Sequence, residues 1–172
     1  MAAARILLGI ICLAVVNSRT LPERSTVTLR PLHFAAVELG VRESGAPNDG
    51  PRVRAYLVAA DIRVPSAWCA AFVSWCFRQA GHPLPRTGWS PALFPESRIR
   101  LLPASGLVFG IYFPKLGRIG HCGFVERVQG DWIITIEGNT NQAGSREGDG
   151  VYRKWRHRRS VHRFADWESP AP

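Results

Sequence analysis

The chain is poor in cysteine, in lysine and in long apolar runs. Four of its 172 residues are cysteines, and Lys115 and Lys154 are its two lysines. No uncharged apolar run reaches the ~18 residues that a membrane-spanning helix needs, which excludes a polytopic membrane protein. A hydrophobic content of 46% and a charged content of 20% are ordinary for one globular domain and exclude a disordered, collagen-like or coiled-coil chain.

Acidic residues are outnumbered, since 13 Asp and Glu stand against 22 Lys and Arg and the net charge is +9. Such a balance suits an anionic partner, which could be nucleic acid, an anionic membrane surface or the acidic polymers of a bacterial envelope. A solvated basic surface that binds nothing is the alternative, and the charge by itself does not decide. No segment resembles a nucleic-acid-binding motif, so no nucleic-acid partner is expected.

The N-terminus has the three-part layout of a secretory signal peptide. Arg5 carries a positive charge, residues 6–16 are apolar and uncharged, and Val16–Ser18 offers small or medium-sized residues for cleavage. We predict a signal peptide over residues 1–18 and a polar linker over residues 19–30. We also predict export to the periplasm or the extracellular space, with no integral membrane segment after cleavage. A misassigned start codon is the alternative.

Removal of this leader would remove Cys12 and leave Cys69, Cys76 and Cys122. An odd number cannot form a closed disulfide framework, so at least one thiol is free or paired between molecules. A zinc site with His121 as the fourth ligand is an alternative. However, the six residues between Cys69 and Cys76 are unlike the tight cysteine pairs of structural zinc sites. We expect no metal.

Helical signals come first along the chain and strand signals follow. Asn48 or Asp49, and then Ser66, are candidate N-caps. The predicted helices span residues 31–39, 51–60 and 67–80, and the predicted strands span residues 107–113, 119–128, 132–137, 151–155 and 162–167. The proline-rich stretch 82–105 is predicted to be a long surface excursion. This order predicts an α+β fold in one domain over residues 31–168, with N-terminal helices packed on a C-terminal antiparallel sheet.

Four residues form a candidate catalytic set. Cys69 lies in the first turn of the third predicted helix, where free backbone N–H groups and the helix dipole favour a thiolate. A nucleophilic cysteine needs a base, and the base needs an acceptor that orients it. His121 is the candidate base, and the hairpin through residues 129–131 brings it to the same end of the sheet as Glu137 and Asn139. Seen alone, Cys69 and His121 would each be an ordinary buried residue.

Three motifs in this order resemble the CHAP family of cysteine, histidine-dependent amidohydrolases and peptidases, which cleave bacterial peptidoglycan. They are Trp68–Cys76 (WCAAFVSWC), Gly120–Glu126 (GHCGFVE) and Thr135–Thr140 (TIEGNT). The resemblance runs from about Leu32 to Trp167. Any one motif is moderately specific, whereas all three at this spacing are strong. The resemblance implies a papain-like α+β fold.

The resemblance also implies a role for each of the four residues. The Cys69 thiolate would attack an amide carbonyl, His121 would protonate the leaving amine, Glu137 would orient His121, and Asn139 would polarise or position. The implied function is a peptidoglycan hydrolase, either an N-acetylmuramoyl-L-alanine amidase or an endopeptidase, that acts through an acyl-enzyme. It requires no metal or cofactor, and we expect a monomer with peptidoglycan as its substrate.

Two tryptophans and a basic segment are candidate binding residues. Trp68 precedes the candidate nucleophile, and Trp89 lies in the proline-rich excursion, where it could line a substrate groove. Packing in the core is the alternative for both. The segment from Arg153 to Arg163 holds six basic and no acidic residues. It either attracts an anionic wall polymer or forms a solvated strand edge.

The chain departs from the family pattern at two positions. Leu107 follows Gly106 where the family often has Gly-Asp, and Cys122 stands where an aliphatic residue usually follows the histidine. The calcium loop of some members has no counterpart, because residues 47–50 supply too few oxygens. Two other functions stay open: a non-catalytic basic module that binds wall polymer or nucleic acid, and an amidase of small amides. A binding module would not need the cysteine, histidine and glutamate set.

Overall fold

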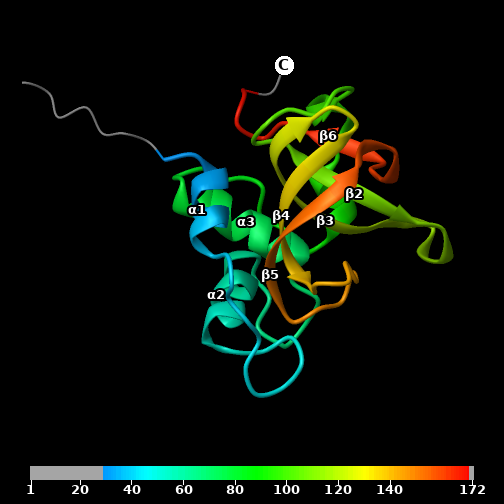
Figure 1. Cartoon of the computed structure of the whole chain (residues 1–172). Coiled ribbons are helices and arrows are strands. Elements are labelled where there is room, and N and C mark those ends of the chain that lie inside the picture. The colour runs from blue at the N-terminus through cyan, green and yellow to red at the C-terminus, as the bar shows by residue number, and fades with distance from the viewer. Residues whose placement is uncertain (1–28, 171–172) are drawn as a thin grey trace, which may run out of the picture.

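The computed structural model describes residues 29–170, and Figure 1 shows the helices gathered beside one antiparallel sheet. The helices are α1 (Pro31–Val37), α2 (Pro51–Ala59) and α3 (Cys69–Gln79). The strands are β1 (Ile99–Arg100), β2 (Val108–Phe113), β3 (Arg118–Gln129), β4 (Trp132–Thr140), β5 (Gly150–His157) and β6 (Arg163–Ala165). The predicted α+β fold, with N-terminal helices packed on a C-terminal sheet, is confirmed.

The predicted signal peptide, Cys12 and most of the predicted linker lie outside the described residues. Arg30, the second described residue, holds the start of the described chain against a segment near the C-terminus. Its Nε donates to Oε2 of Glu168 at 2.8 Å, and its Nη2 donates to the carbonyl of Ser105 at 3.2 Å. No helix within residues 29–170 has the length and apolar character to cross a membrane.

The sheet has the strand order β1-β6-β2-β3-β4-β5, with antiparallel neighbours throughout. The C-terminal strand β6 therefore lies between β1 and β2 instead of following β5 at the edge (Figure 1). Strands β3 and β4 form the predicted hairpin and pair from Gln129 and Trp132 to Phe124 and Ile136. Strand β1 was not predicted, because two residues within the proline-rich stretch carry no periodic pattern.

Helix α3 lies at the centre of the core because almost every side chain along it is apolar. All its residues from Cys69 to Phe77 are buried. Phe72 and Phe77 contact Phe124 of β3, with ring centroids 6.5 and 5.7 Å apart. Burying one such ring contributes roughly 1.5–3 kcal/mol. A second cluster contains Phe109, Val125, Ile133 and Phe164.

The close approach of α3 to β4 depends on one glycine. A Cβ atom on Gly138 would lie 2.7 Å from ring atoms of both Trp68 and Phe72. Side-chain carbons do not come that close, so only glycine lets the first turn of α3 lie directly against β4. This contact brings Cys69 to the end of β4 that carries Glu137.

Two predicted helix caps are wrong. The Ser66 hydroxyl donates to the Val64 carbonyl at 3.2 Å, and α3 begins three residues further along. Helix α2 is preceded by Gly50 and has no side-chain cap, while the Asp49 carboxylate binds Arg54 at 2.5 Å. Each of these side chains has another partner, and Oδ1 of Asn48, the other candidate cap of α2, accepts from Asn139.

Candidate active site

Cys69 is the first residue of α3, where backbone N–H groups have no intrahelical partner. These groups and the helix dipole favour a negatively charged sulfur. The residue is 4% exposed, and its Sγ lies 3.4 Å from the hydroxyl oxygen of Ser90. Ser90 begins the short 3₁₀ turn Ser90–Leu93 within the proline-rich stretch. The thiol therefore lies at the edge of the core, almost covered.

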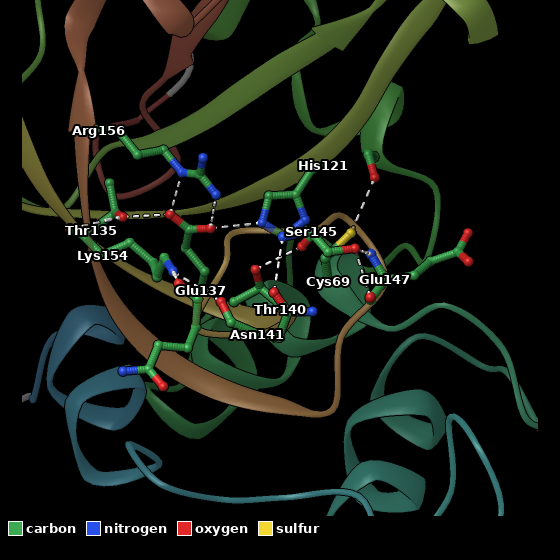
Figure 2. Close-up of polar contacts among 12 residues, drawn as sticks. Cys69, His121, Thr135, Glu137, Thr140, Asn141, Ser145, Glu147, Lys154 and Arg156 are labelled. Atoms are coloured by element: carbon green, nitrogen blue, oxygen red, sulfur yellow. Dashed lines mark hydrogen bonds and ion pairs between the residues drawn. The ribbon is translucent and has the colours of Figure 1, made fainter.

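His121 lies on β3, and its imidazole is buried. Its Nε2 is 2.8 Å from Oε2 of Glu137, and its Nδ1 has no hydrogen-bond partner within residues 29–170. In Figure 2 the ring lies between the Glu137 carboxylate and the Cys69 sulfur. A hydrogen on Nε2 leaves Nδ1 free to take the proton of the thiol. In an active site without substrate, the hydrogen bond between nucleophile and base is often long or poorly aligned and shortens when the substrate binds.

Glu137 is fully buried on β4, and both of its oxygens have partners. Oε1 accepts from the Thr135 hydroxyl at 2.5 Å and from Nε of Arg156 at 2.6 Å. Oε2 accepts from Nη2 of Arg156 at 2.5 Å and faces His121. Burial raises the pKa of the carboxyl, but Arg156 and then His121 outweigh burial and lower this pKa to about 2. Glu137 is therefore an ionised, fixed acceptor for the imidazole.

The pKa of the Cys69 thiol lies below that of the His121 imidazole, the reverse of their usual order. The pKa of Cys69 is well below its usual range, and the neighbouring Cys122 thiol is the largest cause of this lowering. His121 and Ser90 add to this effect, and burial opposes it. Burial lowers the pKa of His121, but Cys69 and Glu137 outweigh burial and raise it to about 9. Between the two pKa values the pair is a thiolate and an imidazolium.

The other two described cysteines remain protonated. Cys76 is fully buried about two turns along α3, and burial raises its pKa well above the usual range. Cys122 follows His121 on β3, and burial and the nearby Cys69 sulfur raise its pKa too. All three thiols are free. Across the described part of the chain, no three His, Cys, Asp or Glu side chains are placed to hold a metal ion, so the zinc alternative has no ligand set there.

Asn139 makes its hydrogen bonds away from the thiol and the imidazole. Its Oδ1 accepts from the backbone N–H of Trp68 at 3.0 Å. Its Nδ2 donates to the Gly148 carbonyl at 3.0 Å and to Oδ1 of Asn48 at 3.2 Å. Its φ of 56° is in the left-handed region that asparagine tolerates. Of the two roles expected for it, this geometry fits positioning, because Asn139 holds the residue before Cys69 against the end of β4.

The two candidate substrate-binding tryptophans lie in different surroundings. Trp68 is fully buried, stacks on Tyr56 with ring centroids 5.4 Å apart, and donates from Nε1 to Glu43 at 2.8 Å. It has no surface to offer a ligand, so the substrate-binding interpretation of Trp68 is corrected to packing in the core. Trp89 is 53% exposed, and its role in substrate binding stays a prediction.

Three side chains that contact Cys69 or Glu137 were not predicted as partners, namely those of Ser90, Thr135 and Arg156. Arg156 belongs to the basic segment that was interpreted as surface, but only 14% of its side chain is exposed. Glu137 could have indicated the contact with Arg156, because a carboxylate buried in the sheet requires a cationic partner and β5 was the next predicted strand. No pattern in the proline-rich stretch indicates that Ser90 contacts Cys69.

Iodoacetamide is expected to alkylate Cys69 at least about a hundredfold faster than Cys76 or Cys122 near neutral pH. Cys69 is a thiolate there and is 4% exposed, whereas the other two are fully covered, protonated thiols. Because the pKa of Cys69 is lowered, its rate should stay high below the usual range of cysteine and decline only as the pH falls through the lowered pKa. Peptide mass spectrometry of timed samples between about pH 4 and pH 9 measures both effects.

The denatured protein is the control for this experiment, because its cysteines all titrate as in a free peptide. Equal rates for Cys69, Cys76 and Cys122 of the folded protein would contradict the assignment. So would a Cys69 rate that follows the pH dependence of the denatured control.

The family model for the CHAP domain matches residues 62–139. The matched stretch contains α3 and strands β1 to β3, and it includes Cys69, His121, Glu137 and Asn139. The resemblance drawn from the three motifs is confirmed, and it is a resemblance to a family of peptidoglycan amidases and peptidases. A search of curated proteins and a search of solved structures each gave no match.

Proposed function

We propose, from the CHAP match over residues 62–139, that this protein is a peptidoglycan hydrolase that cleaves an amide bond in or next to the stem peptide. The bond is either the N-acetylmuramoyl-L-alanine amide or a peptide bond of the stem. The observation that carries the proposal is the buried line of the Glu137 carboxylate, the His121 imidazole and the Cys69 thiol (Figure 2).

The first half of the proposed reaction forms an acyl-enzyme. The Cys69 thiolate attacks the carbonyl carbon of the amide, and the negative charge moves to the carbonyl oxygen. Free N–H groups in the first turn of α3 are suited to stabilise that oxygen. Nδ1 of the His121 imidazolium gives its proton to the nitrogen of the amide. The C–N bond then breaks, the amine leaves, and the acyl group remains on the sulfur as a thioester.

The second half releases the acid and restores the thiolate. Neutral His121 takes a proton from water, and the hydroxide oxygen attacks the thioester carbonyl. The C–S bond breaks and the sulfur leaves as the thiolate, so the thiolate–imidazolium pair is formed again. Glu137 orients and supports the imidazolium through Nε2 but does not touch the substrate in this scheme, and it is therefore a positioning residue.

The proposal places the protein outside the cytoplasm, as the signal-peptide pattern of residues 1–18 predicts. Its net charge of +9 favours adsorption to an anionic cell wall. The exposed Trp89 lies next to Ser90 and is suited to stack on part of the substrate. We propose a monomer that needs no metal or cofactor.

Digestion of purified sacculi tests the function directly. The protein without its predicted leader is incubated with sacculi of several wall chemistries under reducing conditions, and the soluble products are analysed by mass spectrometry. We expect new amine ends. The fragment masses should distinguish an amidase, which separates the glycan from L-alanine, from an endopeptidase, which cuts within the stem.

Two controls complete this experiment, namely sacculi without protein and protein pretreated with iodoacetamide. Binding to sacculi without release of any fragment from any wall type would contradict the proposal and favour the non-catalytic binding module. Release of ammonia or small amines from soluble amides, with intact sacculi, would favour the amidase of small amides.

A further inference from the structure

Trp89 and Arg118 form a pair of side chains near the candidate active site, and the proposed function gives Arg118 no role. The Cζ atom of Arg118 lies 4.0 Å from the centre of the Trp89 indole. Trp89 is 53% exposed, and Arg118 is partly exposed. We call these two residues the Trp89–Arg118 pair.

The chain connects this pair directly to both the candidate nucleophile and the candidate base. Trp89 immediately precedes Ser90, whose hydroxyl oxygen is 3.4 Å from the Cys69 sulfur. Arg118 is the first residue of β3, three residues before His121 on the same strand. At ~3.3 Å per residue, it lies roughly 10 Å along the strand from His121. An extended substrate with its amide at Cys69 would reach Arg118 within about three residues.

Most N–H groups of the Arg118 guanidinium form no hydrogen bond within residues 29–170. Arg118 forms no ion pair within residues 29–170, and its side chain makes one hydrogen bond there, from Nη1 to the carbonyl of Ile119 at 3.0 Å. Other arginines of the fold are neutralised by carboxylates, among them Arg153 by Glu126. Arg118 is instead held by an aromatic face, which fixes a guanidinium without neutralising its charge.

A carboxylate is the group that such a site fits best. A guanidinium held flat presents parallel N–H donors to both oxygens of a carboxylate, a bidentate contact that is stronger than a bond between neutral groups. The exposed part of the indole offers an apolar face beside it. This combination suits an anionic, partly apolar residue of a peptide.

We propose that the Trp89–Arg118 pair is a subsite for a carboxylate of the substrate within about three residues of the cleaved amide. The inference rests on the proposed function for the identity of the substrate. It deepens that function by naming what the site selects: a stem peptide whose carboxylates are free, in preference to the same peptide with carboxamides in their place.

Binding to a protein that cannot turn over is the first test. Synthetic muramoyl stem peptides are prepared in two forms, one with free carboxylates and one with carboxamides, and titrated into the Cys69→Ala variant by calorimetry. We expect the free-carboxylate form to bind about tenfold more tightly. In the same background, Arg118→Gln should abolish this preference, and Trp89→Ala should weaken it because the guanidinium loses its support.

Arg127→Gln is the matched control. Arg127 lies on the same strand, is exposed, and forms no ion pair in the part of the chain that the structure describes, so its replacement changes the net charge equally. We expect this variant to keep the tenfold preference. Circular dichroism should give the same melting temperature for both glutamine variants, because neither side chain is in the core.

Three results would overturn the subsite: equal binding of the two forms to Cys69→Ala, binding of neither form, or a preference that survives Arg118→Gln. Hydrolysis of the same peptides by the unsubstituted protein is measured separately. Failure to cleave either form argues against the proposed function, whereas the binding preference reports on the subsite alone. The two failures are therefore distinguishable.

Discussion

Replacement of Cys69 by alanine is expected to lower the hydrolysis of sacculi by at least about 10⁴-fold while the protein stays folded. The substitution removes the one described thiol whose pKa is lowered, and without it no acyl-enzyme can form. Alanine is a good residue for the first turn of a helix, and the side chain lost is small, so the melting temperature should change little. The initial rate of amine release and thermal denaturation measure the two effects.

Cys76→Ala is the matched control for this substitution. It removes the same side chain from the same helix, but at a fully buried position whose thiol has a raised pKa. We expect it to lower stability slightly through the small cavity that it leaves and to keep the hydrolytic activity. Hydrolysis by Cys69→Ala at the rate of Cys76→Ala would remove Cys69 from the mechanism.

Glu137→Gln is expected to reduce both activity and stability. The substitution leaves the Arg156 guanidinium, 14% exposed, without its counter-charge, and the loss of one partner of a buried ion pair costs about 3–5 kcal/mol of the free energy of unfolding. The acceptor of the His121 imidazole also loses its negative charge, so hydrolysis should fall on the order of 10³-fold. Urea denaturation and the rate of amine release give the two values.

The pH profile of Glu137→Gln separates loss of orientation from general damage. The carboxylate is one of the groups that raise the pKa of His121 to about 9. Without it this pKa falls, so the imidazolium that protonates the leaving amine is lost at a lower pH. The alkaline limb of the remaining activity should therefore move to lower pH. An unchanged limb would contradict the support that we assign to Glu137.

Arg156→Met provides the second side of a double-mutant cycle. The double variant with Glu137→Gln leaves no unpaired charge, so it should recover part of the stability lost by Glu137→Gln alone. Activity should not recover, because the carboxylate that orients His121 is still missing. A double variant with the summed destabilisation of the two single variants would show that the pair is not coupled.

Local sequence rules predicted the parts of this fold that are formed by neighbours in the chain. The helical spacing of apolar residues in the third predicted helix, and the turn through residues 129–131, are patterns of a few residues, and both elements are present. The shared face of His121 and Glu137 does not follow from the turn alone. Counted from the Gln129–Trp132 pair, Glu137 would lie opposite Phe124 and on the other face from His121. The register shift between Val125 and Arg127 brings the two side chains to one face.

The partners of the candidate site could not be predicted in this way. Ser90 lies in a stretch without periodicity, and the sequence alone does not say that it reaches the Cys69 sulfur. The segment that holds Arg156 has no acidic residue, so its arginines were interpreted as surface. In the fold, one of them turns inward because the buried Glu137 cannot remain charged without a cation.

The sequence by itself determined the α+β class, the helix that begins near Cys69, and the strands that carry His121 and Glu137. Only the tertiary structure decided that Trp68 fills the core and that Asn139 holds the backbone of the residue before the thiol. Periodicity, capping and turn preferences act between residues a few positions apart. The bond from Trp68 to Asn139 joins residues 71 positions apart, so it forms only when α3 packs against β4 across Gly138.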